Sequence, residues 1–356
     1  MENGTELNPS GLAGWWVAQN DGTLRCSLCA HGCCLRDGQR GICGVRMSRK
    51  DRIDSLVYGR VIAEHIDPIE KKPIFHMLPG SLSYSIATFG CNFHCLHCQN
   101  ASISQVPRDM AIENAGVFRG PEEIVTLALA GDCQSLSYTY VEPTVFFEYA
   151  YDCCLAASAR GLKNVFVSNG YMTKAVVARL APVLTAINID LKSFNNDFYK
   201  KICGAQLQPV LDTIVLCKDV GIWVEVTTLI IPGLNDSGEE LRRIASFLAS
   251  IDPSIPWHVS GYRPAYRMAA PPTPESTLQK AQRIGLDQGL HYVYTGNRPG
   301  AGGEDTRCPS CGFVVISRQG FRVTANRLDS EICPQCATHV KGVWRYPGGV
   351  VLFQHS

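Results

Sequence analysis

The sequence predicts an α/β protein built as a partial (β/α) barrel, with a small cysteine-rich metal-binding module at each end. Two observations predict a parallel sheet, open or closed into a barrel, and the partial barrel is what a family resemblance given below implies. Short β-rich runs alternate with helical stretches between about residues 80 and 300, and their spacing near 25–35 residues is typical of βαβ units on a parallel sheet. The modules follow from a third observation, since both ends are glycine-rich and carry grouped cysteines. We therefore expect a metal-binding module over residues 1–60, the barrel over 61–300 and a second module over 301–356.

The barrel should contain seven parallel strands. They are expected at 84–89, 136–140, 164–167, 186–191, 223–230, 257–259 and 292–295. Between them, PEEIVTLALAG predicts a helix with Pro121 in its first turn, and VFFEYAYDCCLAASARG predicts a helix that ends at Gly161. Functional groups should then gather at the carboxyl ends of the strands.

Composition limits the function classes. Lys and Arg number 33 against 32 Asp and Glu, a net charge of +1, so no overall basic field argues for nucleic acid or a membrane surface as partner. No run approaches the roughly 18 apolar residues of a transmembrane helix, and residues 1–16 lack the pattern of a signal peptide, so we expect a cytoplasmic protein. The 17 cysteines are an odd count in a chain too long to need disulfides. Metal binding is the better explanation for them.

The central cysteine group follows the first expected strand directly. Cys91, Cys95 and Cys98 form a C-x3-C-x2-C pattern, here called the triad, and offer three thiolates. A [4Fe–4S] cluster usually takes four, so three leave one iron open for an outside ligand. A structural zinc ion needs four ligands, and completing that set would require His94 or His97. The pattern therefore favours an iron–sulfur cluster with an open iron.

The triad, with Phe93 between its first two members, resembles the signature of the radical S-adenosylmethionine (SAM) superfamily. The resemblance extends over nearly the whole chain. It is carried, in order, by EKKPIFHMLPGS, CNFHCLHCQNASIS, SYTYVEPTVFFEYA, FVSNGYMT, IDLKSF, TTLIIPGLND, WHVSGYRPAYRM and YVYTGNRP. These segments are similar to the radical SAM member of the AmmeMemoRadiSam system, a relative of the pyruvate formate-lyase activating enzymes.

This resemblance implies a barrel of the radical SAM type and a definite chemistry. The open iron of the [4Fe–4S] cluster chelates SAM. One electron, from a donor such as flavodoxin or ferredoxin, cleaves the sulfonium bond and gives a 5′-deoxyadenosyl radical, which abstracts hydrogen from a substrate that the sequence does not identify. Memo-like and AMMECR1-like proteins are the implied partners.

The resemblance also implies which strand ends contact SAM. Glu142 would accept a hydrogen bond from the SAM ammonium group, although the two glycines that precede this glutamate in activating enzymes are Tyr140 and Val141 here. The remaining implied SAM contacts are Ser168, Asn169, Asp190, Lys192 and Asn297. Asp190 and Lys192 could instead form only a local ion pair, because residues two apart on a strand share a face.

His258 is the candidate catalytic residue. It lies in an expected strand near the barrel mouth, where an imidazole can bind a substrate carboxylate or phosphate, or move a proton. The alternative is a core histidine that is hydrogen-bonded to the backbone.

Each terminal group offers four cysteines. Cys308, Cys311, Cys333 and Cys336, the C-terminal quartet, form two C-x2-C knuckles that predict a zinc ribbon, with a rubredoxin-like iron site as the alternative. Cys26, Cys29, Cys33 and Cys43, the N-terminal quartet, fit zinc or a second [4Fe–4S] cluster, because ligand count alone does not separate the two. Cys34 adjoins Cys33 and could replace it as a ligand.

Three functions remain open at this point. The first is a radical SAM enzyme that acts on a small substrate, which needs a metabolite-sized pocket. The second is an activase that makes a glycyl radical on a partner protein, which needs an open groove. The third is a non-catalytic iron–sulfur and zinc scaffold, which would not need polar residues at successive strand ends.

Overall fold

The computed structural model describes residues 14–107, 110–297 and 303–344. Its centre is an eight-stranded sheet in the order β15-β14-β13-β12-β11-β10-β8-β7. The strands are β7 Ala63–Pro68, β8 Leu82–Ala87, β10 Ser135–Tyr138, β11 Lys163–Ser168, β12 Ala186–Asp190, β13 Trp223–Ile230, β14 Trp257–Gly261 and β15 Val293–Gly296. From β8 to β15 all neighbours are parallel, and β7 pairs antiparallel with β8 at one edge. The predicted α/β barrel architecture, with its seven parallel strands, is confirmed.

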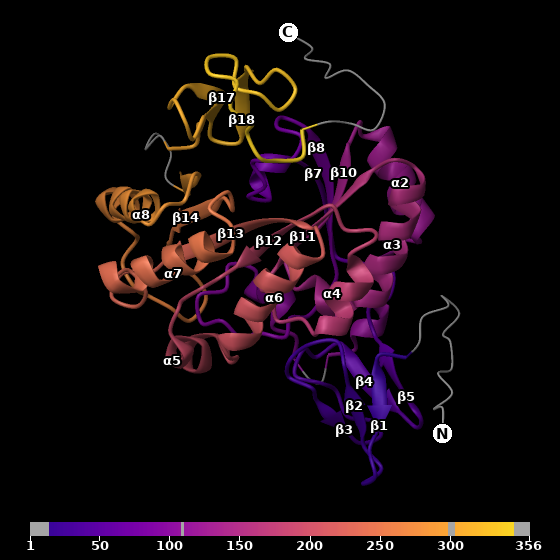
Figure 1. The fold of residues 1–356 in the computed structure, drawn as a ribbon. Coiled ribbons are helices and arrows are strands. Elements are labelled where there is room, and N and C mark those ends of the chain that lie inside the picture. The colour runs from indigo at the N-terminus through magenta and orange to yellow at the C-terminus, as the bar shows by residue number, and fades with distance from the viewer. Residues whose placement is uncertain (1–13, 108–109, 298–302, 345–356) are drawn as a thin grey trace.

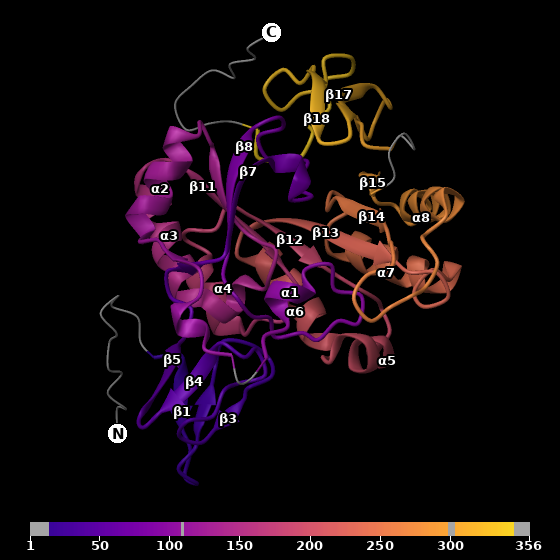
Figure 2. The same cartoon turned by 180° about the vertical axis from the view of Figure 1, so that it is seen from behind.

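Helices connect the parallel strands and cover the outer face of the sheet (Figures 1 and 2). The longer ones are α2 Pro121–Ala130, α3 Phe147–Ala159, α4 Lys174–Leu180, α6 Gln208–Asp219, α7 Gly238–Ile251 and α8 Glu275–Asp287. Short turns are α1 Ala101–Ser104, α5 Asn196–Phe198, the 3-10 turns Ile69–Lys71, Ile112–Asn114 and Pro143–Phe146, and the π turn Tyr199–Cys203. Pro121 opens α2, and Gly161 takes φ +80° just beyond α3, as the sequence predicts.

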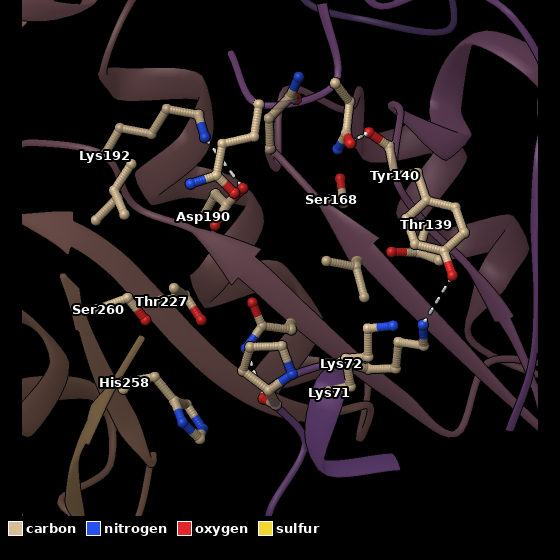
Figure 3. Close-up of a pocket in the computed structure, with 18 of the residues that line it drawn as sticks. Lys71, Lys72, Thr139, Tyr140, Ser168, Asp190, Lys192, Thr227, His258 and Ser260 are labelled. Atoms are coloured by element: carbon tan, nitrogen blue, oxygen red, sulfur yellow. Dashed lines mark hydrogen bonds and ion pairs between the residues drawn. The ribbon is translucent and has the colours of Figure 1, made fainter. Parts of the chain in front are cut away.

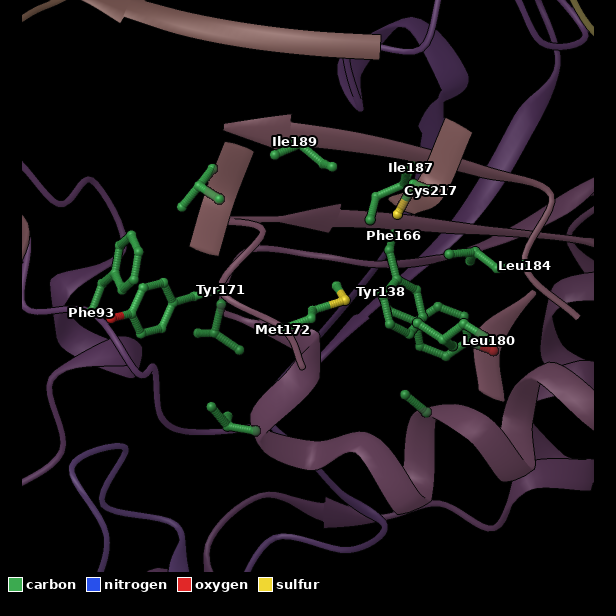
Figure 4. Packing of buried hydrophobic residues seen from close by; sticks show 14 of the residues in the cluster. Phe93, Tyr138, Phe166, Tyr171, Met172, Leu180, Leu184, Ile187, Ile189 and Cys217 are labelled. Carbon is green, nitrogen blue, oxygen red and sulfur yellow. The ribbon is translucent and has the colours of Figure 1, made fainter. Parts of the chain in front are cut away.

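The main core lies between the sheet and these helices. Tyr138 of β10 and Phe166 of β11 pack with ring centroids 5.1 Å apart, close to Leu180 and Leu184 (Figure 4). These side chains are almost fully buried. Truncating Phe166 to alanine should cost about 3–5 kcal/mol of stability. The rigid sheet that results fixes the strand ends, where the predicted site residues lie.

The N-terminal part shares this core. It contains a three-stranded sheet of β1 Trp16–Ala18, β2 Leu24–Cys26 and β3 Cys34–Leu35, and a hairpin of β4 Arg46–Arg49 and β5 Arg52–Ser55. Two further short strands, β6 Arg60–Val61 and β9 Val117–Phe118, pair with each other. Leu24, Leu28 and Leu35 belong to the same buried cluster as the barrel. The expected boundary at residue 60 thus falls inside β6, whose partner β9 lies within the expected barrel.

The C-terminal part, residues 303–344, is called the ribbon below. It consists of β16 Thr306–Arg307, β17 Val314–Gln319 and β18 Arg322–Asn326 in one antiparallel sheet. Its own buried cluster includes Cys308 and Cys333 and packs on Phe75, Tyr292 and Tyr294 of the barrel. The expected boundary at residue 300 lies outside the described residues, as does most of the N-terminal segment inspected for a signal peptide. Within the described ranges, no helix is long and apolar enough to cross a membrane.

Candidate active site

A cavity of about 360 Å³ opens at the carboxyl ends of the parallel strands (Figure 3). Its lining comes from every part of the barrel, because consecutive strands deliver their last residues to the same edge. The cavity is lined by the triad and by all the predicted site residues of the barrel, namely Glu142, Ser168, Asn169, Asp190, Lys192, His258 and Asn297. The structure therefore brings together residues that span more than half of the chain.

The triad lies in the loop after β8, at one side of this cavity. His94 N donates to Cys203 O (2.8 Å) and Leu96 N to Ile202 O (3.0 Å), which fixes the loop against the chain before α6. Phe93 N lies 3.4 Å from Cys91 Sγ and Ser104 Oγ 3.2 Å from Cys98 Sγ. Burial raises the pKa of Cys91 well above its ordinary value.

Glu142 is held by donors of its own chain. The carboxylate, 2% exposed, accepts from Thr144 N (3.0 Å), Ser168 Oγ (2.9 Å) and Asn169 N (2.7 Å). Burial raises the pKa of Glu142 despite these bonds. The glutamate therefore ties the end of β10 to the end of β11, and it places Ser168 and Asn169 beside the triad, where Asn169 Nδ2 also reaches Asn92 Oδ1 at 2.7 Å.

Tyr140 keeps the backbone shape that a glycine would give. Its φ is +65°, in the left-handed region that side chains rarely adopt. The conformation is held from both sides, because Asn100 Nδ2 donates to Tyr140 O (2.7 Å) and Tyr140 OH donates to Asp67 Oδ2 (2.7 Å). Lys72 Nζ lies 4.8 Å from the centre of the tyrosine ring. Tyr140 therefore adopts a backbone conformation that favours glycine.

Asp190 and Lys192 form an ion pair of 3.0 Å at the end of β12. Burial opposes the charge of Lys192, but Asp190 holds the lysine pKa well above its ordinary value. The local pair that the sequence allowed is present, and both residues also line the cavity (Figure 3). Asn297 follows β15 with φ +60°, in a turn.

His258 is 4% exposed and bonded to a side chain. Its Nε2 donates to Glu225 Oε2 over 2.7 Å. Glu225 also accepts from the backbone of Phe75 and His76 and from Trp223 Nε1. Burial disfavours this carboxylate, yet the bond from His258 keeps the Glu225 pKa below its ordinary value. His258 thus lines the cavity as one half of a buried pair, a partner that the sequence pattern did not indicate.

Sequence reasoning missed several lining residues. Lys71 and Lys72 precede β8 in EKKPIF, and Phe321 lies at the tip of the β17–β18 hairpin of the ribbon. Three buried polar atoms of the lining residues, His97 Nδ1, Asn188 Oδ1 and Thr227 Oγ1, have no hydrogen-bond partner among the described residues. Buried polar atoms normally find a partner, so these three are exceptions in the described part of the chain.

The C-terminal quartet forms a compact site in the ribbon. Its four sulfurs lie within 4.8 Å of one another, with Cys308 3.5 Å from Cys336 and Cys311 3.7 Å from Cys333. Sulfurs at about 2.3 Å around one tetrahedral ion would be about 3.8 Å apart. The quartet can therefore bind a single metal ion, and it leaves no position open for a substrate.

The N-terminal quartet lines a separate cavity of about 20 Å³, together with His31, Arg46 and Asn92. Burial raises the pKa of Cys43 to about 11 and also raises that of Cys29 and Cys33. Cys34 is exposed and is absent from this lining. The five other cysteines, Cys133, Cys153, Cys154, Cys203 and Cys217, are buried.

The chain belongs to the radical SAM superfamily, whose family model matches residues 85–248. Members of this family are enzymes that use SAM and a [4Fe–4S] cluster, which sets the scaffold alternative aside. An uncharacterized protein of Methanocaldococcus jannaschii is 44% identical over 325 residues, 90% of this chain and 96% of that protein. The pyruvate formate-lyase-activating enzyme of Streptococcus mutans is 20% identical, covering 51% of this chain and 73% of its own length. The crystal structure of Streptococcus suis SuiB bound to precursor peptide SuiA is similar, with a TM-score of 0.49 and 15% sequence identity. The match covers 65% of this chain and 52% of the SuiB chain.

The site fits the cofactors of this family. The triad offers three thiols at the wall of an open cavity, and His97, Asn188 and Thr227 also line the space that SAM and a substrate would share. When bound, the cluster supplies the electron that cleaves SAM. The chain itself positions both ligands: Glu142 fixes the strand ends beside the triad, and the Asp190–Lys192 pair offers both signs of charge.

Proposed function

We propose that the protein cleaves SAM reductively at the triad and uses the resulting 5′-deoxyadenosyl radical to abstract hydrogen from a small anionic substrate in the same cavity. The observation that carries this proposal is the cavity, whose volume of about 360 Å³ is in the range of small-molecule sites, roughly 300–1,000 Å³. The SAM contacts proposed are Glu142, Ser168, Asn169, Asp190, Lys192 and Asn297. His258 is the proposed catalytic residue, on the substrate side.

The charge of the cavity supports an anionic substrate. Lys71 and Lys72 bind the same carboxylate, Asp67, at 2.7 and 2.6 Å. The two lysines share this one carboxylate, and burial lowers the pKa of Lys72, whereas Lys192 and His258 each have an acidic partner of their own. A substrate carboxylate or phosphate would give the two lysines a second acceptor.

The finer assignments are proposals of the same kind. The sequence segments that resemble the AmmeMemoRadiSam system suggest Memo-like and AMMECR1-like partners, and the family implies a reductant such as flavodoxin. All 17 cysteines lack disulfide bonds, which suits the reducing cytoplasm. We also propose that the chain has three parts, with the barrel between two metal-binding modules at residues 1–60 and 301–356. Zinc is the metal that we propose for the C-terminal quartet.

An activase is the second candidate function, because the Streptococcus mutans relative is named for activating pyruvate formate-lyase. A protein substrate would present one loop to the cavity. The two candidates differ in the size of the molecule that loses hydrogen.

Anaerobic incubation with SAM and dithionite tests the proposal. The intact protein should release methionine and 5′-deoxyadenosine, and Cys95→Ala should release neither. A deuterated cell extract, split into small molecules and proteins, then identifies the hydrogen donor. Deuterium in 5′-deoxyadenosine from the small-molecule fraction supports the proposal, whereas deuterium from the protein fraction alone supports the activase.

A further inference from the structure

We infer that the N-terminal quartet, Cys26, Cys29, Cys33 and Cys43, binds a second iron–sulfur cluster, which passes electrons to the cluster of the triad. The four cysteines come from β2, the loop before β3 and the loop before β4, and all four line one cavity. Four thiols around one space are a metal site. The question is which metal group the spacing of the sulfurs fits.

The spacing argues against a single zinc ion. In the part of the chain that the structure describes, only the C-terminal quartet brings three or more potential ligand atoms within 4.8 Å of one another. The sulfur atoms of the N-terminal quartet as a group are farther apart than this limit, and so are those of the triad. In a [4Fe–4S] cluster each cysteine binds its own iron, which holds the sulfurs farther apart.

Arg46 places a buried positive charge beside the quartet. Its side chain is 2% exposed, and two of its nitrogens donate to Glu148 at 2.7 Å each. The third nitrogen, Nε, is buried and has no hydrogen-bond partner among the described residues, and the residue lines the cavity. A guanidinium next to the quartet suits the negative charge of a thiolate-bound cluster.

The position of the quartet suits electron transfer to the triad. His31, between Cys29 and Cys33, contacts Asn92 O through Nε2 (2.8 Å), and Asn92 is the residue after Cys91. The ring of Tyr171 lies 4.8 Å from that of His31 and 5.2 Å from that of Phe93, which belongs to the triad loop (Figure 4). The cavity and the triad loop therefore share Asn92 and one continuous set of packed rings.

The relay step balances with a donor of the flavodoxin or ferredoxin class. The donor loses one electron, the N-terminal cluster gains it and then passes it to the triad cluster, and no bond forms or breaks in the transfer. This role rests on the proposed function, whereas the presence of the cluster does not.

Metal analysis of the full chain, reconstituted anaerobically with iron, sulfide and zinc, tests the cluster. We expect about eight iron, eight sulfide and one zinc per chain. About four iron with two zinc would overturn the inference. The triple variant Cys91→Ala/Cys95→Ala/Cys98→Ala should keep about four iron, and a triple variant without iron would contradict it. Cys34→Ala is the matched control, because Cys34 is exposed and outside the cavity, and it should keep the iron of the intact protein.

A comparison of electron donors tests the relay. Dithionite is small enough to reduce the triad cluster directly, whereas a protein donor must use an entry site. In Cys29→Ala the ratio of the flavodoxin-driven to the dithionite-driven rate of SAM cleavage should fall at least tenfold. An unchanged ratio would rule out the relay. An intact protein that holds eight iron but cleaves no SAM with dithionite would refute the proposed function and leave the second cluster standing.

Discussion

The triad and the C-terminal quartet use the same ligand in opposite ways. The triad presents three thiols to a cavity of about 360 Å³, whereas the quartet places four sulfurs within 4.8 Å of one another around a closed centre. Three ligands and an open wall leave room for chemistry, and four ligands with no open position build structure. Ligand number and the space in front of the ligands, more than the residue type, therefore distinguish a reactive metal site from a structural one.

The two regions are nevertheless joined. Arg318 of β17 is buried against Glu70 and donates to Phe75 O over 2.7 Å, and both of these barrel residues line the cavity. His76 Nδ1 donates to Lys341 O of the ribbon (2.7 Å), and its Nε2 accepts from Tyr294 OH of the barrel (2.6 Å). The ribbon thus supports one wall of the active site, so damage to the closed site should reach the open one.

The largest expected effect comes from breaking the closed site with Cys333→Ala. Metal binding at structural sites contributes folding free energy on the order of 10 kcal/mol in small domains, and Cys333 lies inside the buried cluster of the ribbon. We expect loss of one zinc per chain and fast proteolysis within 303–344. Cys217→Ala, a buried cysteine of α6 outside every metal site, is the control. A zinc-free variant that resists protease like the control would show that the quartet has no structural role.

A smaller effect is expected where the two regions meet, at His76. Burial lowers the pKa of His76 to about 4 from 6.5. The unfolded chain therefore binds the proton first as pH falls, so stability is full above pH 6.5 and declines toward pH 4, by about 3 kcal/mol in all. His76→Gln removes this titration, and its free energy of unfolding should vary less between pH 7 and 4.5, measured by urea denaturation. Equal pH slopes for both proteins would contradict the role of His76.

On the open side, Glu142→Ala should weaken SAM binding ten- to a hundredfold. Its carboxylate organises Ser168 and Asn169 beside the triad, and a charge-assisted bond to the SAM ammonium would be worth about 1.5–3 kcal/mol. Cleavage of bound SAM should slow less than binding weakens. Titration followed by the cluster spectrum measures the affinity. A SAM affinity equal to that of the intact protein would remove Glu142 from the SAM site.

The smallest effect on SAM binding is expected for His258→Asn, on the substrate side. SAM affinity and substrate-free cleavage should change less than about threefold, which is below 1 kcal/mol. Hydrogen abstraction from the small-molecule extract should be lost if the imidazole binds the substrate, as proposed. A loss of SAM affinity as large as in Glu142→Ala would instead mark His258 as a structural member of the Glu225 pair.

Local signals in the sequence were enough to predict the fold. The strand runs, Pro121 and Gly161 determine the structure of only the few residues around them, so they can be recognised in the sequence alone. The cysteine spacings likewise indicate the loops that could bind metal. The carboxyl-end rule then brought Glu142, Asp190 and His258 to one cavity. What the sequence did not reveal depends on contacts between distant segments.

Three features illustrate this limit. Lys72 binds Asp67 nearby, but only the fold places both beside Tyr140. Glu225 lies 33 residues before His258, and only the pairing of β13 with β14 joins them. The arrival of Phe321 at the cavity depends on how the ribbon docks, which no periodicity indicates.

The central claim is that the three thiols of the triad leave one iron for SAM. Electron paramagnetic resonance of the reduced protein, with SAM labelled by 15N at the amino group, tests it most directly. The account predicts a hyperfine coupling between the label and the reduced cluster in the intact protein, and none in Cys95→Ala. A reduced cluster on the triad that shows no coupling to labelled SAM at saturating concentration would contradict it.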